Sequence, residues 1–268
     1  MSAFINAIRM LNIRELDIAR SYCPQCNRER YFLQLNNSEI AIRCLSCRGS
    51  LITLSLIGVI KDIVGDLTNK SVYELSARGV FVEYLKRVCG ALTCSEFFDD
   101  VEVGGYKEGV ICQDVQQLTF KSKSFDICTS LEVFEHVPHD DQGFSEIHRV
   151  LNDNGIFIFT VPIDLQSNTL ERAMIGQDGE IEHLAEPEYH VDPLRSHSSI
   201  LAFRTYGIDI VDRLIRAGFA KAEIRKCGLL EPWGHGRAVI VAYKRIDPDG
   251  SSGVGGIVVH SAGGQPKL

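Results

Sequence analysis

From Ser71 onward the sequence alternates between strand-like and helix-like segments. The strand-like segments are apolar runs bounded by turn residues: VYEL, ALTCSEFF, GVICQD, SFDICTSL and GIFIFTVP. Between them, VFVEYLKRV and DQGFSEIHRVL carry apolar residues at helical spacing. Strands that alternate with helices in this way pair in parallel and are covered on both faces. The pattern therefore predicts an α/β fold with a doubly wound, mostly parallel sheet.

The 268 residues suit one full-sized domain with a small appendage. Near the end, AKAEIRKC and AVIVAYK have no helix between them, which indicates an antiparallel edge. We expect a helical segment at 1–19, a cysteine ribbon at 20–50, a connecting helix at 51–70, the α/β domain at 71–246 with an insertion loop at 163–206, and a flexible tail rich in Gly and Ser at 247–268.

The charge and the apolar runs bear on possible partners. The formal net charge is −7, so no overall field attracts nucleic acid or an anionic membrane. The longest apolar run, LITLSLIGVI, ends at Lys61-Asp62, well short of the roughly 20 residues that a membrane span needs. The N-terminus lacks the pattern of a secretory signal, and the nine cysteines form no disulfide-like ladder. We therefore expect a cytoplasmic protein with no membrane span.

Four of the cysteines form two matched pairs. Cys23 and Cys26 are followed after 17 residues by Cys44 and Cys47, with a turn-forming NNS between two short strand candidates, YFLQL and EIAIR. Two CxxC turns brought together by a hairpin supply the four thiolates of tetrahedral zinc. Because all four positions are filled by protein, the predicted zinc is structural. Buried or redox-active cysteines are the alternative.

The segment from Val72 to Pro162 resembles class I S-adenosylmethionine-dependent methyltransferases, in particular the group of the type 11 methyltransferase domain. The resemblance is carried by CQDVQQLTFKSKSFDICTSLEVFEHVPHDDQGFSEIHRVLNDNGIFIFTVP at 112–162 and extends over about 70–245. It implies a Rossmann-like, seven-stranded sheet and S-adenosylmethionine as the cofactor. A CxxC ribbon in front of such a domain also resembles an arrangement among bacterial members.

The resemblance implies cofactor contacts at the ends of the second and third strands. A carboxylate holds a ribose diol best, because its two oxygens can accept two hydroxyl hydrogens. Glu96 stands in that position, and Asp99 or Asp100 is the competing choice. Asp114 occupies the place of the family residue that meets the adenine amino group; the alternative is a helix N-cap.

The turn after the first strand departs from the family pattern E/D-x-G-x-G-x-G. Glu74 is kept, Ser76 and Arg78 stand at glycine positions, and Gly79 lies one position before the third glycine. Arginine cannot approach the cofactor as closely as glycine. Arg78 could instead donate to the carboxylate of the cofactor. No G-x-G-x-x-G occurs in the sequence, which disfavours a simple dehydrogenase.

The fourth strand should end where cofactor and acceptor meet, since ligands of open α/β sheets lie outside the carboxyl ends of the strands. Ser130 and Leu131 are placed to contact the methionine end of the cofactor. His136 follows directly, and His190 lies in the insertion; either could act as a catalytic base, or His136 could only order its loop. Further candidates around the same mouth are His183, Asp192, Trp233 and His235.

Two functions are compatible with these residues. The first is methyl transfer from S-adenosylmethionine to a small-molecule or saccharide acceptor. The second is a catalytically silent methyltransferase-like module whose ribbon binds a protein or nucleic acid. The altered turn favours the second, whereas Glu96, Asp114 and the segment 126–137 favour the first. The ribbon carries five arginines against two glutamates, although solvated arginines are the simpler interpretation.

Overall fold

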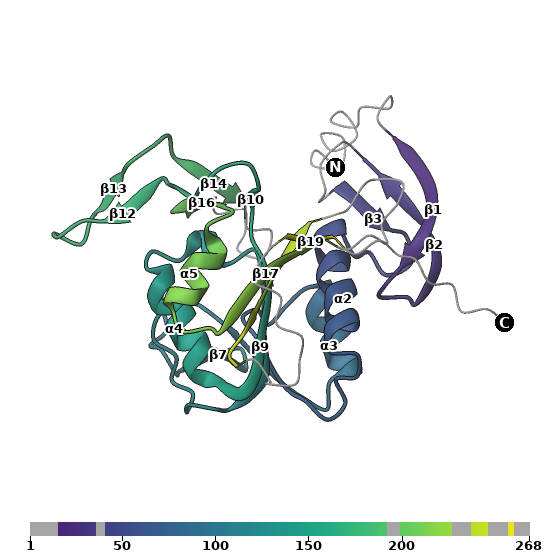
Figure 1. The fold of residues 1–268 in the computed structure, drawn as a ribbon, viewed down its shortest axis with the longest axis horizontal. Helices are drawn as coiled ribbons and strands as arrows, with labels where there is room; N and C mark the ends of the chain where they lie inside the picture. The colour runs from purple at the N-terminus through teal and green to yellow at the C-terminus, as the bar shows by residue number, and fades with distance from the viewer. Residues whose placement is uncertain (1–15, 36–40, 192–198, 227–236, 246–256, 260–268) are drawn as a thin grey trace.

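The computed structural model describes residues 16–35, 41–191, 199–226, 237–245 and 257–259 (Figure 1). Its main element is a nine-stranded sheet in the order β19 (Ile257–Val259), β17 (Lys221–Lys226), β18 (Ala238–Tyr243), β9 (Leu151–Thr160), β8 (Phe125–Leu131), β4 (Ser71–Glu74), β5 (Ala91–Glu96), β7 (Val110–Cys112) and β6 (Tyr106–Lys107). The strands from β9 to β7 pair in parallel. β18 is antiparallel to β9 and β17. The predicted α/β fold with a mostly parallel sheet is confirmed.

The sheet has two strands more than the seven expected, one at each edge. β6 pairs antiparallel with β7. β19 pairs in parallel with β17, so residues 257–259 are a strand within the expected flexible tail. No helix in the described part of the chain has the length and apolarity of a membrane-spanning segment.

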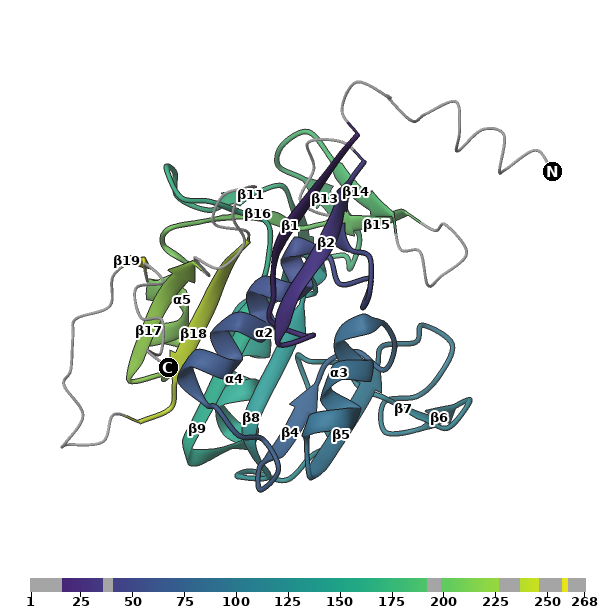
Figure 2. The same cartoon turned by 90° about the vertical axis from the view of Figure 1, so that its right-hand side faces the viewer.

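Helices cover both faces of the sheet, and each face has its own apolar core. α2 (Leu51–Ile63) and α3 (Val80–Val88) lie on one face, and α4 (Asp140–Val150) and α5 (Ile210–Arg216) lie on the other (Figures 1 and 2). Successive strand residues point to opposite faces. Val72 accordingly packs in the core under α2 and α3, while Tyr73 packs in the core under α4 and α5. Because both faces of the sheet are covered by apolar cores, polar groups that could bind a ligand are expected at the ends of the strands.

α2 joins the sheet to the cysteine ribbon. Its first turn contributes Leu51 and Leu54 to a small core around the ribbon cysteines. Its later residues, from Leu56 to Ile60, pack against the sheet. Ser50 caps the helix by accepting a hydrogen bond from the Thr53 N–H. The helix ends at Ile63, within the connecting segment expected at 51–70.

The ribbon consists of three antiparallel strands, β1 (Asp17–Cys23), β2 (Arg28–Gln34) and β3 (Ile42–Cys44). Only the second and third were anticipated. Residues 17–19 belong to β1, so the helix expected over 1–19 is wrong there, and residues 1–15 lie outside the described residues. β1 pairs with β2 over its whole length, which lets a strand with only two buried residues form next to a partner of similar exposure.

In its described residues, the segment expected as an insertion loop contains seven short strands. They are β10 (Ile163–Asp164), β11 (Leu170–Glu171), β12 (Ala173–Ile175), β13 (Ile181–His183), β14 (Glu188–Val191), β15 (Ser199–Ala202) and β16 (Arg204–Gly207). The hairpin of β12 and β13 projects away from the rest of the molecule (Figure 1). β14 pairs antiparallel with β15, and this pairing places His190 opposite Ile200.

Candidate functional site

The four cysteine sulfurs of the ribbon converge. They all lie within 4.8 Å of one another, and the Sγ atoms of Cys23 and Cys47 are 3.6 Å apart. Tetrahedral zinc with Zn–S bonds of about 2.3 Å places its sulfurs ~3.8 Å apart. The residue after each CxxC pair has a positive φ, 54° at Asn27 and 65° at Arg48, so the two turns have the same form. The donor set fits a closed structural zinc site.

Buried polar atoms without partners gather at the carboxyl edge of the central strands. Among the described residues, eleven buried side-chain nitrogen or oxygen atoms lack a hydrogen-bond partner, and six lie at or just beyond the ends of β4, β8 and β9. They are Oε1 of Glu74, Oγ of Ser130, Oε1 of Glu132, both carboxylate oxygens of Glu135, and Oγ1 of Thr160. Buried polar groups are nearly always hydrogen-bonded in proteins. This edge is therefore where a polar ligand would supply missing partners.

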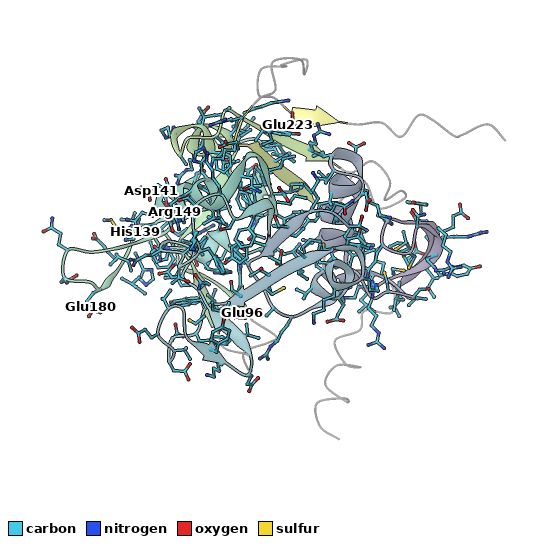
Figure 3. All side chains as sticks on the ribbon, turned by 90° about the horizontal axis from the view of Figure 1, so that it is seen from below. Glu96, His139, Asp141, Arg149, Glu180 and Glu223 are labelled. Atoms are coloured by element: carbon cyan, nitrogen blue, oxygen red, sulfur yellow. The ribbon has the colours of Figure 1, made fainter. Side chains whose placement is uncertain are left out.

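Glu96 ends β5 and holds the turn that follows β4. Its Oε1 accepts a hydrogen bond from the Ala77 N–H at 3.0 Å and a longer one from the Ser76 hydroxyl at 3.4 Å. Figure 3 shows Glu96 across the sheet from Glu223 of β17. The predicted ribose acceptor thus lies beside the turn predicted to bind the cofactor.

Arg78 pairs with a carboxylate of the protein. Its guanidinium pairs with Glu108 between β6 and β7 at 3.0 Å, and the Arg78 side chain is 45% exposed. In this structure the arginine therefore has a protein partner in place of the cofactor carboxylate proposed from the sequence. Gly79 is the residue of this turn with a positive φ, 103°, and a side chain there would meet no atom within 4 Å. None of the described residues 76–78 has a positive φ, so their backbone conformation does not require glycine.

Glu74 is fully buried at the end of β4. Its Oε2 accepts a hydrogen bond of 2.5 Å from the Thr129 hydroxyl. Burial raises the pKa of Glu74 to about 8, and the negative charge of Glu96 adds to the shift. The carboxyl group is therefore mostly protonated at neutral pH.

Asp114 forms a turn instead of a helix cap. Its Oδ1 accepts hydrogen bonds from the backbone N–H of Gln116 at 2.9 Å and from the side-chain amide of Gln116 at 3.1 Å. No helix follows among these described residues, so the N-cap interpretation is wrong. An aspartate that bonds the backbone two residues ahead stabilises a turn by itself.

The end of β8 carries backbone strain. Ser130 is fully buried, Leu131 packs against the core under α2, and Glu132 has a φ of 53°. A positive φ is unfavourable for a residue with a side chain and is concentrated at functional sites. One oxygen of Glu132 accepts a 2.5 Å hydrogen bond from Arg237, the residue before β18.

The structure brings His136 and His190 together. His136 ends the short 3-10 helix η2 (Phe134–His136), and its Nε2 lies 3.2 Å from Nδ1 of His190. The Oε1 atom of Glu135 is 3.7 Å from each of these nitrogens, and Glu188 Oε1 lies 3.1 Å from Nε2 of His190. Burial raises the pKa of Glu135 well above its ordinary value, and the carboxylate of Glu132 contributes. Two histidines and a buried carboxylate thus face one point beyond β8.

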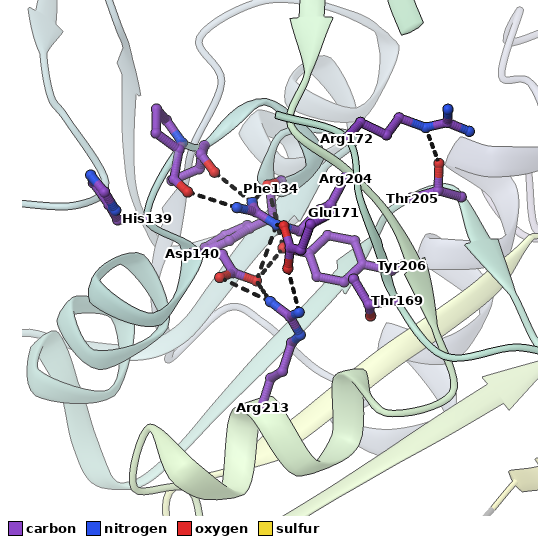
Figure 4. A network of polar contacts seen from close by, with 12 residues as sticks. Phe134, His139, Asp140, Thr169, Glu171, Arg172, Arg204, Thr205, Tyr206 and Arg213 are labelled. Carbon is purple, nitrogen blue, oxygen red and sulfur yellow. Dashed lines mark hydrogen bonds and ion pairs between the residues drawn. The ribbon is translucent and has the colours of Figure 1, made fainter. Parts of the chain in front are cut away.

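A buried arginine fixes the loop that carries this cluster (Figure 4). Arg204 is 3% exposed and donates to the carbonyl oxygens of Phe134, Val137 and Pro138. It also pairs with Glu171 at 3.0 Å. Asp140, Tyr206 and Arg213 extend the network, with the Tyr206 hydroxyl donating to Asp140 at 2.9 Å. The insertion is therefore tied to η2 by buried charges.

Several of these residues were not anticipated from the sequence. Arg204 gave no signal, because its partners Glu171, Phe134, Val137 and Pro138 are distant in sequence. Glu188 is only two residues from His190, but the sequence does not show that the two side chains meet. Glu135 stands beside His136 in the sequence, but the sequence did not show that its side chain is buried. Of the other candidates, His183 is exposed on β13, and Asp100 pairs with Lys107 at 2.6 Å. Asp192, Trp233 and His235 lie outside the described residues.

Comparison with known proteins identifies the α/β part of the chain. Residues 75–159 match a family model described as a methyltransferase domain. The chain carries a methyltransferase domain. The resemblance to S-adenosylmethionine-dependent methyltransferases seen in the sequence is thereby confirmed. No curated protein matches the sequence.

Solved structures of methyltransferases are similar to this chain. An S-adenosylmethionine-dependent methyltransferase from Mesorhizobium loti has 12% identity and a TM-score of 0.48, and the match covers 74% of this chain and 100% of the other. A candidate S-adenosylmethionine-dependent methyltransferase from Listeria monocytogenes has 11% identity and a TM-score of 0.45, with 71% and 98% covered.

Proposed function

We propose that this methyltransferase domain transfers the methyl group of S-adenosylmethionine to a small-molecule or saccharide acceptor. The observation that carries the proposal is Glu96, a carboxylate at the end of β5 that is held beside the turn after β4. Oε1 of Glu74 and Oγ of Ser130, which are buried and have no hydrogen-bond partner among the described residues, lie at the same edge of the sheet and support the proposal. The ribbon would hold a structural zinc through its four cysteines, in a cytoplasmic protein.

In this proposal the two ends of the site have different tasks. Glu96 accepts the ribose hydroxyls, Asp114 meets the adenine, and the turn with Ser76 and Gly79 and the strand end at 130–131 flank the methionine part. The segment with His136 and His190 faces the acceptor. Methyl transfer is an in-line displacement, so alignment of the acceptor atom with the methyl group supplies most of the rate enhancement.

The test is calorimetric titration of the full chain with S-adenosylmethionine and with S-adenosylhomocysteine. Glu96→Ala should weaken binding by about 1.5–3 kcal/mol, because the ribose hydroxyls lose a charged acceptor. Glu96→Gln keeps an oxygen for the Ala77 N–H but removes the charge, and it should lie between wild type and Glu96→Ala. Glu102→Ala, an exposed acidic position in the following loop, is the matched control and should bind as wild type does.

The second candidate function is a silent module that binds a protein or nucleic-acid partner through its ribbon. The ion pair of Arg78 with Glu108 supports it, because a glycine of the family turn has been replaced by a residue engaged elsewhere. If wild-type protein binds no S-adenosylmethionine at millimolar cofactor concentration, the silent module is the favoured function. Unchanged affinity in Glu96→Ala would instead move the ribose acceptor to Asp99 or Asp100.

A further inference from the structure

We infer that Glu135, His136 and His190 form a second metal site, which binds a divalent transition-metal ion. One donor atom from each of the three residues lies within 4.8 Å of the other two. This site is separate from the ribbon cysteines. It lies just beyond the carboxyl end of β8, on the acceptor side of the proposed methyl-transfer site.

The hydrogen bond to Leu201 places a hydrogen on Nδ1 of His136. Its Nδ1 lies 2.8 Å from the backbone carbonyl oxygen of Leu201. A carbonyl oxygen can only accept, so Nδ1 carries the hydrogen and Nε2 of the neutral ring presents a lone pair. Histidines that bind metals commonly donate their other ring nitrogen to a backbone carbonyl or carboxylate, which orients the ring.

The same reasoning applies to His190. Its Nε2 lies 3.1 Å from the Glu188 carboxylate, which accepts, so Nδ1 of the neutral ring is left with a lone pair. That nitrogen is 3.2 Å from Nε2 of His136. Two lone pairs at this distance repel each other unless a positive charge lies between them. The separation suits two nitrogens on one metal ion with bonds of about 2.0–2.1 Å.

Glu135 strengthens the requirement for a cation. Its carboxylate is fully buried, and neither oxygen has a hydrogen-bond partner among the described residues. Glu132 and Glu188 are also close, with Arg237 pairing with Glu132 and Arg172 with Glu188. A buried charge is tolerated when it is paired or coordinates a metal. Because the buried Glu135 oxygens accept no hydrogen bond from the described residues and lie beside the two imidazoles, one metal ion would satisfy the carboxylate and both rings at once.

The donors select the class of ion. Two imidazole nitrogens and one carboxylate oxygen suit Mn²⁺, Fe²⁺, Co²⁺ or Zn²⁺, whereas Mg²⁺ and Ca²⁺ prefer oxygen ligands throughout. Three protein ligands leave coordination positions open. If the proposed methyl transfer is correct, an acceptor hydroxyl would occupy such a position, and the inference narrows the acceptor to a molecule with a hydroxyl group. The metal would favour loss of the hydroxyl proton to solvent. The oxygen then bonds to the methyl carbon as the carbon–sulfur bond breaks, and the sulfur keeps the electron pair.

The experiment supplies the full-length protein with only about one zinc per chain, enough for the four thiolates, and removes unbound zinc. It then titrates Mn²⁺ and measures bound ion by electron paramagnetic resonance. Mn²⁺ avoids the thiolates of the ribbon, because it prefers oxygen and nitrogen ligands. Wild type should bind about one equivalent, as the single three-donor site requires. Glu135→Gln and His190→Ala should each weaken binding by roughly 100-fold or more, since they remove direct ligands and even outer-shell changes cost 10–100-fold. His183→Ala, at an exposed histidine of the same insertion, is the control and should match wild type.

Two results would overturn the inference. One is that wild type binds no Mn²⁺, in which case a shared proton between the histidines replaces the metal. The other is that His190→Ala binds Mn²⁺ as tightly as wild type does. His190→Ala is the deciding variant if Glu135→Gln does not fold, because the His190 side chain is 30% exposed and its removal disturbs the core less. S-Adenosylmethionine is titrated into the same samples. If wild type binds S-adenosylmethionine but not Mn²⁺, only the metal site is refuted. If it binds Mn²⁺ but not S-adenosylmethionine, only the proposed methyl transfer is refuted.

Discussion

Replacing Glu74 by glutamine should change how stability depends on pH. Glu74 is fully buried, and its pKa is raised to about 8 by burial and by Glu96. In the unfolded chain a glutamate titrates near its ordinary value of about 4.3. Between these values the folded state holds one more proton than the unfolded state. Because the folded pKa is the higher one, this contribution is fully present below about pH 4 and is lost as pH rises through 8.

The size of the effect follows from the two pKa values. One pKa unit corresponds to about 1.4 kcal/mol, so proton binding by Glu74 stabilises the fold by about 2.7 kcal/mol at pH 6 and by about 0.1 kcal/mol at pH 9. Glu74→Gln keeps an oxygen for the Thr129 hydroxyl but has no titrating group. The unfolding free energy of the variant, relative to wild type, should therefore rise by about 2.6 kcal/mol between pH 6 and pH 9.

Urea unfolding followed by circular dichroism at pH 6, 7.5 and 9 measures this difference. Glu83→Gln is the control, because Glu83 is an exposed residue of α3 whose pKa is lowered, chiefly by its hydrogen bond with Lys86. Its relative stability should stay constant over the same range. A change below about 0.5 kcal/mol for Glu74→Gln would mean that the buried carboxyl is ionised throughout and would refute the reasoning.

Three further predictions concern the ribbon, the altered turn and the buried network. Changing Cys23 and Cys44 together to serine should abolish binding of about one zinc per chain; undiminished zinc by elemental analysis would contradict the ribbon site. Arg78→Ala and Glu108→Ala should each change stability by less than about 1 kcal/mol and weaken S-adenosylmethionine equally little, because the pair is exposed. A marked loss of affinity in Arg78→Ala alone would show that this arginine binds the cofactor after all. Arg204→Met should destabilise the fold by about 3 kcal/mol, since it leaves buried carbonyls and Glu171 without their donor. A thermal shift no larger than that of a surface substitution would contradict this.

The sequence predicted the centre of the sheet well, because buried strands are marked by composition. GIFIFTVP at 155–162 is apolar on both faces. Its first six residues form the second half of β9, and the last two follow the end of that strand. SFDICTSL likewise forms β8. The edges were less predictable. β6 and β19 are two and three residues long. β1 has only two buried residues, Ser21 and Cys23, and its sequence DIARSYC contains no apolar run that would mark a strand.

The site was predictable only where its residues are close in sequence. Cys23, Cys26, Cys44 and Cys47 were found by spacing, and their sulfurs do converge. The contact between His136 and His190 spans 54 residues and depends on the pairing of β14 with β15, which periodicity could not reveal. The helix considered after Asp114 fails for a local reason, since the aspartate satisfies the backbone of its own turn.

The most direct test of the account is amide hydrogen exchange of the wild-type chain with and without S-adenosylhomocysteine. The account predicts that the ligand slows exchange in the turn Leu75–Gly79, at the end of β5 near Glu96, and at Ser130–Glu132, because these segments line the proposed cofactor site. The ribbon should be unaffected. Exchange that is unchanged at all three segments at saturating ligand, or slowed only in the ribbon, would contradict a cofactor site at the carboxyl edge of the sheet.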